Sequence, residues 1–145
     1  MEPIIWRQTL GDLLRRTAAR VPQKTAIVCG ERSWTYGEFD QLCDRLATGL
    51  HALGVRAGDR VAILARNSDA FAVVRFAVAR LGVILVPINF MLNAQEVAYV
   101  LRHSGAKLLC MDSELTPLGR AAASLNTEVQ ECIWLPSEQD RKSVV

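Results

Sequence analysis

The feature that most constrains the fold is a regular alternation of short apolar segments with longer segments of helical spacing. Apolar runs at residues 60–65, 83–87, 107–111 and 131–135 have the length and composition of β-strands. Strands that alternate with helices in this way form a parallel sheet, because parallel neighbours need a long crossover, usually a helix. The sequence therefore predicts an α/β fold with a largely parallel sheet.

The first helix of this alternating region carries clear boundary signals. Asn67 or Ser68 is expected to cap a helix that runs to Leu81, and Gly82 follows where a helix commonly ends. The helix is apolar nearly all round, so we expect it to be buried on more than one side. The run at 83–87 is also continuously apolar, which is typical of a strand in a sheet covered on both faces.

The later helices show similar signals. Asn93 and Glu96 have the spacing of a capping box, and Gly105 is placed to end the helix that they open. Thr116-Pro117 puts proline at a first helical position. The order strand, helix, strand, helix, strand, helix, strand is thus complete from residue 60 to residue 135.

A helix and a β-hairpin are expected to precede the sheet. Thr9 and Asp12 form a capping box before a segment of helical spacing that ends near Pro22. Short β-rich runs at 25–29 and 33–35 flank a Gly30-containing turn, which predicts a hairpin.

A long helix should follow the hairpin. Thr35 and Glu38 form a second capping box, and the apolar spacing continues to about Leu53. Gly54 then stands where a helix C-terminus favours positive φ.

Composition narrows the classes of function. The 145 residues are 50% hydrophobic, with 17 Lys and Arg against 15 Asp and Glu, and they fit one globular domain. We expect residues 1–136 to form one α/β domain, which the resemblance described below implies to be an incomplete N-terminal domain, and residues 137–145 to be a polar tail. The balanced charge argues against a nucleic-acid-binding surface. No apolar stretch reaches the length of a membrane span, and no signal peptide is recognisable, so a cytoplasmic location is expected.

The residues that most often carry chemistry have ordinary structural interpretations here. Cys29, Cys43, Cys110 and Cys132 form no CxxC pair, which argues against a zinc site and against a disulfide framework. His51 and His103 lie near predicted helix ends, where the helix dipole favours a cation.

Polar residues that directly follow predicted strands are candidates for ligand contacts. Asn67-Ser68-Asp69 and Asn89 follow predicted strands, but helix capping and turn formation account for them. No glycine-rich phosphate loop, HExxH or GxSxG motif is present. We therefore assign no catalytic, cofactor-binding or metal-binding residue.

Several pieces of the chain, taken in order, resemble the opening of the AMP-forming acyl-CoA synthetases, which are adenylate-forming enzymes. The resemblance covers roughly residues 8 to 112 and rests on these segments: Thr35–Phe39, Leu53–Val55, Gly58–Ile63, Arg66–Ser68, Leu81–Asn89, Asn93–Val97 and His103–Leu109. It implies the front part of a large N-terminal α/β domain. It also implies, for a full-length enzyme, a carboxylic acid substrate with ATP, Mg²⁺ and coenzyme A.

The family's phosphate-binding loop and its later catalytic segments have no counterpart here. The leading hypothesis is therefore an N-terminal fragment of an acyl-CoA ligase that is inactive alone and self-associates through uncovered apolar faces. One alternative is a standalone, non-catalytic α/β module that binds a partner chain or a small ligand. A third is an unrelated small α/β domain that matches by chance.

Overall fold

The computed structural model describes residues 9–136, which contain five helices and six strands. In chain order the elements are α1 (Leu10–Arg20), β1 (Thr25–Cys29), β2 (Arg32–Thr35), α2 (Tyr36–Ala52), β3 (Arg60–Leu64), α3 (Asp69–Arg80), β4 (Ile84–Pro87), α4 (Ala94–Ser104), β5 (Leu108–Asp112), α5 (Thr116–Ala123) and β6 (Glu131–Leu135). The predicted α/β fold is confirmed, with boundaries within one or two residues of those expected. The predicted polar tail lies outside the described residues.

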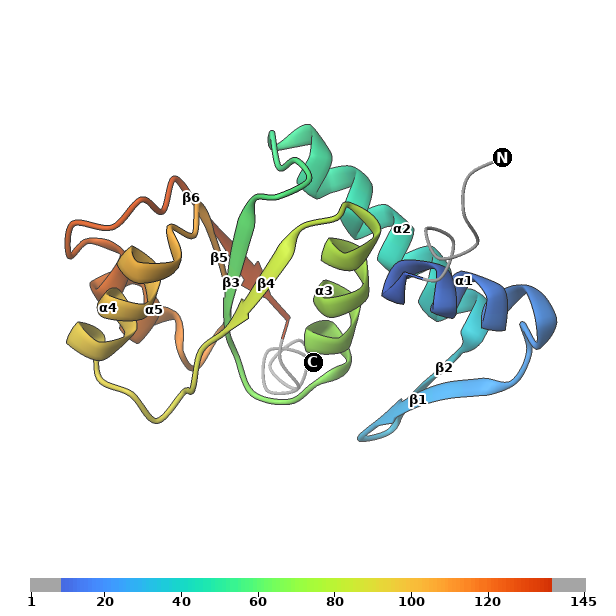
Figure 1. Cartoon of the computed structure of the whole chain (residues 1–145). Coiled ribbons are helices and arrows are strands. Elements are labelled where there is room, and N and C mark those ends of the chain that lie inside the picture. The colour runs from blue at the N-terminus through green and yellow to red at the C-terminus, as the bar shows by residue number, and fades with distance from the viewer. Residues whose placement is uncertain (1–8, 137–145) are drawn as a thin grey trace.

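The central sheet has four parallel strands in the order β4-β3-β5-β6, and β1 and β2 form a separate antiparallel hairpin. Helices α4 and α5 lie on one side of the sheet and α2 and α3 on the other (Figure 1). Helix α1 and the hairpin lie beyond α2 and α3 (Figure 1). The described chain is therefore a sheet with helices on both faces and a further layer on one of them.

Each face of the sheet has its own apolar core. Val61 and Ile63 of β3 point toward α2 and α3, whereas Ala62 and Leu64 point toward α4 and α5. The alternation follows from the two-residue repeat of a strand, and it explains why Val61–Leu64 of β3 and Leu108–Met111 of β5 are continuously apolar. A third core lies under the hairpin, where the rings of Phe39 and Phe76 meet edge to face with centroids 5.6 Å apart.

The predicted helix boundaries are confirmed in detail. Complete capping boxes open α1 at Thr9, α2 at Thr35 and α4 at Asn93. Ser68, rather than Asn67, caps α3, and its hydroxyl accepts a hydrogen bond from the backbone N–H of Phe71 at 3.1 Å. These contacts join residues close in sequence and satisfy backbone donors that the first turn of a helix leaves free.

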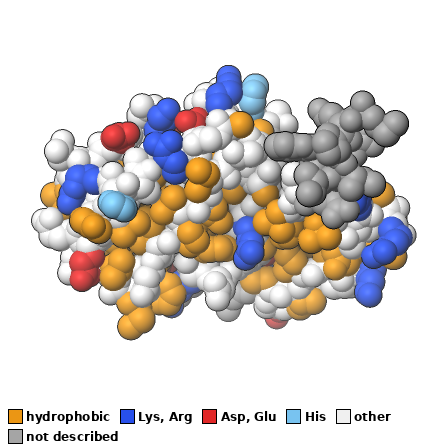
Figure 2. Space-filling view, in the orientation of Figure 1, with side chains coloured by type: hydrophobic (Ala, Val, Ile, Leu, Met, Phe, Trp, Pro, Cys, Tyr) orange, Lys and Arg blue, Asp and Glu red, His pale blue; other side chains and the backbone are white. Residues whose placement is uncertain are grey.

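The sheet is covered on both faces, as the apolar run at 83–87 predicts, but beyond Val83 the run itself is only partly buried. Strand β4 lies at the edge of the sheet, and its residues are exposed or half-buried, with Ile84 54% exposed. Figure 2 shows hydrophobic side chains in a broad band across the face on which β4 lies in front. An apolar run predicts a strand, but it does not reveal whether a neighbour covers both of its sides.

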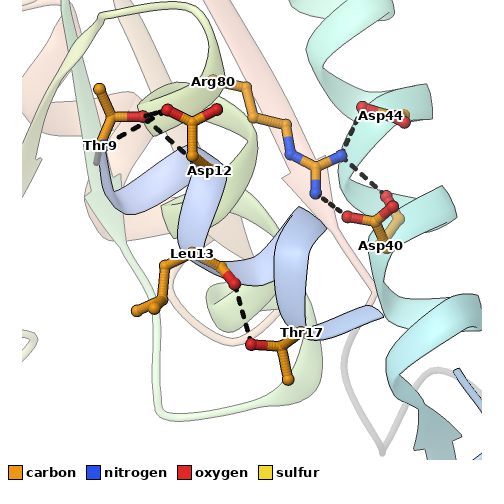
Figure 3. Close-up of polar contacts among 7 residues, drawn as sticks. All are labelled: Thr9, Asp12, Leu13, Thr17, Asp40, Asp44 and Arg80. Carbon is orange, nitrogen blue, oxygen red and sulfur yellow. Dashed lines mark hydrogen bonds and ion pairs between the residues drawn. The ribbon is translucent and has the colours of Figure 1, made fainter. Parts of the chain in front are cut away.

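A buried arginine joins α2 to α3. The guanidinium of Arg80 forms ion pairs with Asp40 and Asp44, and its side chain is only 4% exposed (Figure 3). It also donates a 3.0 Å hydrogen bond to the carbonyl oxygen of Asp40. Helix α1 crosses close above it, because a Cβ added to Gly11 would lie 3.1 Å from the Arg80 backbone. Arg80 thus joins α3 to α2, and α1 packs closely against the same point.

The packing of α5 on the sheet yields a stability prediction. A Cβ on Gly119 would lie 2.3 Å from the sulfur of buried Met111, so Gly119→Val should overpack this contact. We expect it to lower the free energy of unfolding by about 2 kcal/mol, measured by urea denaturation. Gly49→Val is the matched control, since nothing lies within 4 Å of a Cβ there and valine favours helix more than glycine. Equal losses in both variants would contradict the predicted overpacking.

Candidate functional site

The first place to look for a ligand site is the edge of the sheet where the parallel strands end. The chain runs from β3 to β4 in one direction across the sheet and from β5 to β6 in the other. The connections therefore diverge between the adjacent strands β3 and β5. In open α/β sheets, ligands bind outside the carboxyl ends of the strands at such a point.

The carboxylate of Asp112 lies at this edge, beside the ends of β3 and β5. Asp112, the last residue of β5, is buried and accepts a 2.8 Å hydrogen bond from the backbone N–H of Arg66, just beyond β3. Its other oxygen accepts the N–H of Leu115 at 2.9 Å. Both carboxylate oxygens of Asp112 are thus bonded to the backbone, and they link the end of β5 to the segments beyond β3 and before α5.

A second buried carboxylate, that of Asp69, lies at the start of α3. Asp69 is 6% exposed and accepts hydrogen bonds from Arg32 at 2.9 Å and from the indole N–H of Trp34 at 3.0 Å. The N–H of Ala70 donates to it at 3.0 Å. Helix capping is the role that the sequence predicts for Asn67-Ser68-Asp69. Ser68 does cap α3, but capping does not account for the ion pair of Asp69 with Arg32. Arg32 and Trp34 precede it by 37 and 35 residues, so no local signal pairs them.

The remaining polar groups at this edge make local contacts. Asn89 accepts the N–H of Met91 at 3.0 Å and so shapes the turn after β4, as the sequence predicts. Arg66 pairs with Glu114 at 3.0 Å, and its guanidinium lies 5.6 Å from the centroid of the Phe90 ring. Met91 is 81% exposed. This edge therefore carries an exposed apolar loop beside an ion pair.

The two histidines lie where the helix-end interpretation puts them. His51 and His103 are in the last turns of α2 and α4. The ring of His103 stacks on that of Tyr99, with centroids 5.7 Å apart and an angle of 9° between the planes.

A spacious depression lies elsewhere, between the hairpin, α2, α3 and the end of β6. We call it the β6 groove; it has a volume of about 600 Å³. It is lined by Arg32, Trp34, Leu42, Arg45, Leu46, Asp69, Ala70, Val73, Ile133, Trp134, Leu135 and Pro136. Its walls are mostly apolar, and the only carboxylate among them, Asp69, is already paired with Arg32. The sequence held no signal for it, because its walls come from four separate segments.

The described residues do not fit the cofactors that the family resemblance implies. Both buried carboxylates are bonded to donors of the chain itself, and in residues 9–136 no group of three or more His, Cys, Asp or Glu side chains is placed to hold a metal ion. Over the same range, no helix combines the length and the apolar character needed to cross a membrane. We therefore derive no chemical step through ATP, Mg²⁺ or coenzyme A from this segment.

Comparison with known proteins identifies the class to which this α/β sheet belongs. The model of the AMP-binding enzyme family matches residues 14–144. Over 108 residues the chain is 42% identical to the putative acyl-CoA synthetase YngI of Bacillus subtilis, covering 72% of this chain and 20% of that protein. Over 102 residues it is 42% identical to a feruloyl-CoA synthase of Amycolatopsis, covering 70% and 21%.

Solved structures agree with this match. The N-terminal domain of FACL13 from Mycobacterium tuberculosis superimposes with a TM-score of 0.83 at 33% identity, over 88% of this chain and 34% of that domain. The chain belongs to the AMP-binding enzyme family. It spans about a fifth of the length of the curated relatives it matches.

The ion pair at Asp69 yields a prediction about stability. Asp69→Ala should lower the free energy of unfolding by about 3 kcal/mol, because it leaves Arg32 and Trp34 without their acceptor. The control is Glu114→Ala at the exposed pair with Arg66, which should cost less than about 1 kcal/mol. Urea denaturation followed by near-ultraviolet circular dichroism measures both. Similar losses would show that the Asp69 contact is no stronger than a surface ion pair.

The cysteines yield a prediction about reactivity. Burial raises the pKa of Cys43 and that of Cys110 to about 12, so at pH 8 both thiols stay protonated and shielded from solvent. Cys132 is exposed. Iodoacetamide at pH 8 should therefore modify Cys132 well before Cys43 and Cys110, as read by peptide mass spectrometry. In denaturant this difference should disappear, and comparable rates in the native protein would contradict the burial.

Proposed function

We propose that the chain is the N-terminal part of an ATP-dependent acyl-CoA ligase. Such an enzyme converts a carboxylic or fatty acid, ATP and coenzyme A into acyl-CoA, AMP and pyrophosphate. The observation that carries the proposal is the family match over most of the chain, together with relatives described as a putative acyl-CoA synthetase and a feruloyl-CoA synthase. Within it, residues 1–136 are an incomplete α/β domain, residues 137–145 are a tail, and the protein works in the cytoplasm.

The part played by this segment is that of a scaffold. Within residues 9–136, Asp69, Arg80 and Asp112 bond to the chain itself, and apart from Nε of Arg80 they leave no buried donor without a partner to meet a phosphate or an acyl group. Phosphoryl-group chemistry depends on such positioned donors. The proposal therefore assigns the binding of ATP, Mg²⁺ and coenzyme A to the rest of the enzyme, and it gives the isolated chain no ligase activity.

A chimera tests this proposal. Residues 14–136 would replace the matching stretch of the Amycolatopsis feruloyl-CoA synthase, and formation of feruloyl-CoA from ferulate, ATP and coenzyme A would be measured. Since the segment serves as a scaffold, the chimera should retain activity within about tenfold of the parent, which corresponds to about 1.4 kcal/mol in the activation barrier. Its preference among acids should remain that of the parent.

Two controls accompany the chimera. The 145-residue chain alone should form no acyl-CoA, and any turnover by it would disprove the scaffold role. A chimera carrying Asp69→Ala should lose thermal stability more than it loses preference among acids. A chimera that folds cooperatively but forms no feruloyl-CoA, beside an active parent, would overturn the proposed function.

A further inference from the structure

Helix α1 and the β1–β2 hairpin form an outer layer, residues 9–35, that lies beyond α2 and α3 (Figure 1). The strands of the hairpin pair only with each other. Within residues 9–136, no backbone hydrogen bond joins the outer layer to α3 or to the central sheet. The outer layer is therefore attached to the rest of the chain by its side chains and by the continuation of the chain into α2.

The apolar core beneath the outer layer is small. It contains three buried residues, Leu14, Phe39 and Cys43, whereas the cores on the two faces of the sheet contain thirteen and eleven. No residue of β1 or β2 is fully buried. Since hydrophobic stabilisation scales with the apolar surface removed from water, the outer layer is held less firmly than the sheet and its helices.

Polar contacts at the start of α3 add to this attachment. Arg32 and Trp34 of the hairpin both donate hydrogen bonds to the carboxylate of Asp69, at 2.9 and 3.0 Å. The ion pair of Arg80 with Asp40, by contrast, joins α3 to α2 and involves no residue of the outer layer. Separation of the outer layer therefore breaks the contacts of Asp69 and leaves α2 and α3 joined to each other.

Neither part of the outer layer is stable once it has left α2 and α3. Helix α1 has 11 residues, and an isolated helix of that length is marginal in water. A two-stranded hairpin is likewise marginal on its own. Separation from the helices and loss of structure therefore coincide, which makes opening a single cooperative step.

From these observations we propose that the outer layer opens as a unit while the four-stranded sheet and its helices stay folded. The open form exposes the side of α2 and α3 that carries Phe39, Cys43 and Phe76. The outer layer thus acts as a removable cover, and the apolar face beneath it is reached from solvent only in the open form. This inference concerns the chain itself and does not rest on the proposed function.

Two native cysteines report two kinds of opening. Cys43 lies in the small core beneath the outer layer, whereas Cys110 of β5 lies in a core of the sheet, and both are buried. Neither thiol reacts while it is shielded from solvent. When the rate of labelling by iodoacetamide is proportional to the reagent concentration, it reports the fraction of molecules in which that cysteine is exposed.

The first test is labelling of the 145-residue chain at pH 8, in urea concentrations below the unfolding transition, followed site by site by mass spectrometry. Cys43 should be modified at least tenfold faster than Cys110. Its rate should also rise less steeply with urea, because partial opening exposes less surface than complete unfolding. Equal rates with equal urea dependence would overturn the inference.

Hydrogen exchange distinguishes opening of the whole outer layer from a local movement at Cys43. The amide hydrogens of α1, β1 and β2 should be exposed in the same fraction of molecules as Cys43, whereas those of β3 and β5 should exchange more slowly. Protection of the hairpin equal to that of β5, together with fast labelling of Cys43, would overturn the inference.

A pair of substitutions provides the matched control. Gly119→Val strains the packing of α5 on Met111, and this strain persists in the open form. It should therefore speed the labelling of Cys110 by about thirtyfold, the factor that corresponds to its loss of stability, and leave that of Cys43 unchanged. Asp69→Ala removes contacts that opening itself breaks, so it should speed the labelling of both cysteines. Equal acceleration of both cysteines by Gly119→Val would overturn the inference, as would an unchanged rate at Cys43 in Asp69→Ala.

Discussion

The contact between Asp69 and the hairpin is the interaction on which the arrangement of the layers depends. The hairpin is not part of the central sheet, and its strands pair only with each other. The carboxylate of Asp69 accepts from Arg32 and Trp34 of the hairpin while standing at the first turn of α3. A buried charge without its partner is costly, so this pair fixes one position of the hairpin against the helix. The wall of the β6 groove formed by Arg32 and Trp34 depends on the same contact.

A second carboxylate, that of Asp112, occupies the edge of the sheet where α/β folds commonly bind their ligands. The connections of the sheet diverge between β3 and β5, where α/β proteins commonly bind their ligands. Here Asp112 bonds to the backbone beyond β3 and to the backbone before α5. It therefore ties the segment beyond β3 to the end of β5, at the edge where such ligands bind. This agrees with a segment that supports a site built by other parts of a longer protein.

Local signals explain what could be predicted from the sequence. The capping boxes at Thr9, Thr35 and Asn93 join residues three apart, so the pattern of residue types is enough to find them. The pairs of Asp69 with Trp34 and of Arg80 with Asp40 span 35 and 40 residues, and only the fold brings them together. The edge position of β4 was missed for a similar reason, because exposure depends on the order of strands and not on their composition. The β6 groove, assembled from four segments, could not be found before the fold was known.

The pairing order of the sheet has a consequence for how such a protein is made. Strand β3 pairs with β4 and β5, and β5 pairs with β6, so the four described strands of the sheet pair with one another within residues 60–135. In a longer protein synthesised from its N-terminus, this sheet can therefore close while later segments are still inside the ribosome. During that interval the exposed side chains of Ile84 and Trp134 on the two edge strands face water and other nascent chains. The interval is then a period of aggregation risk, which slow translation just after residue 135 would lengthen.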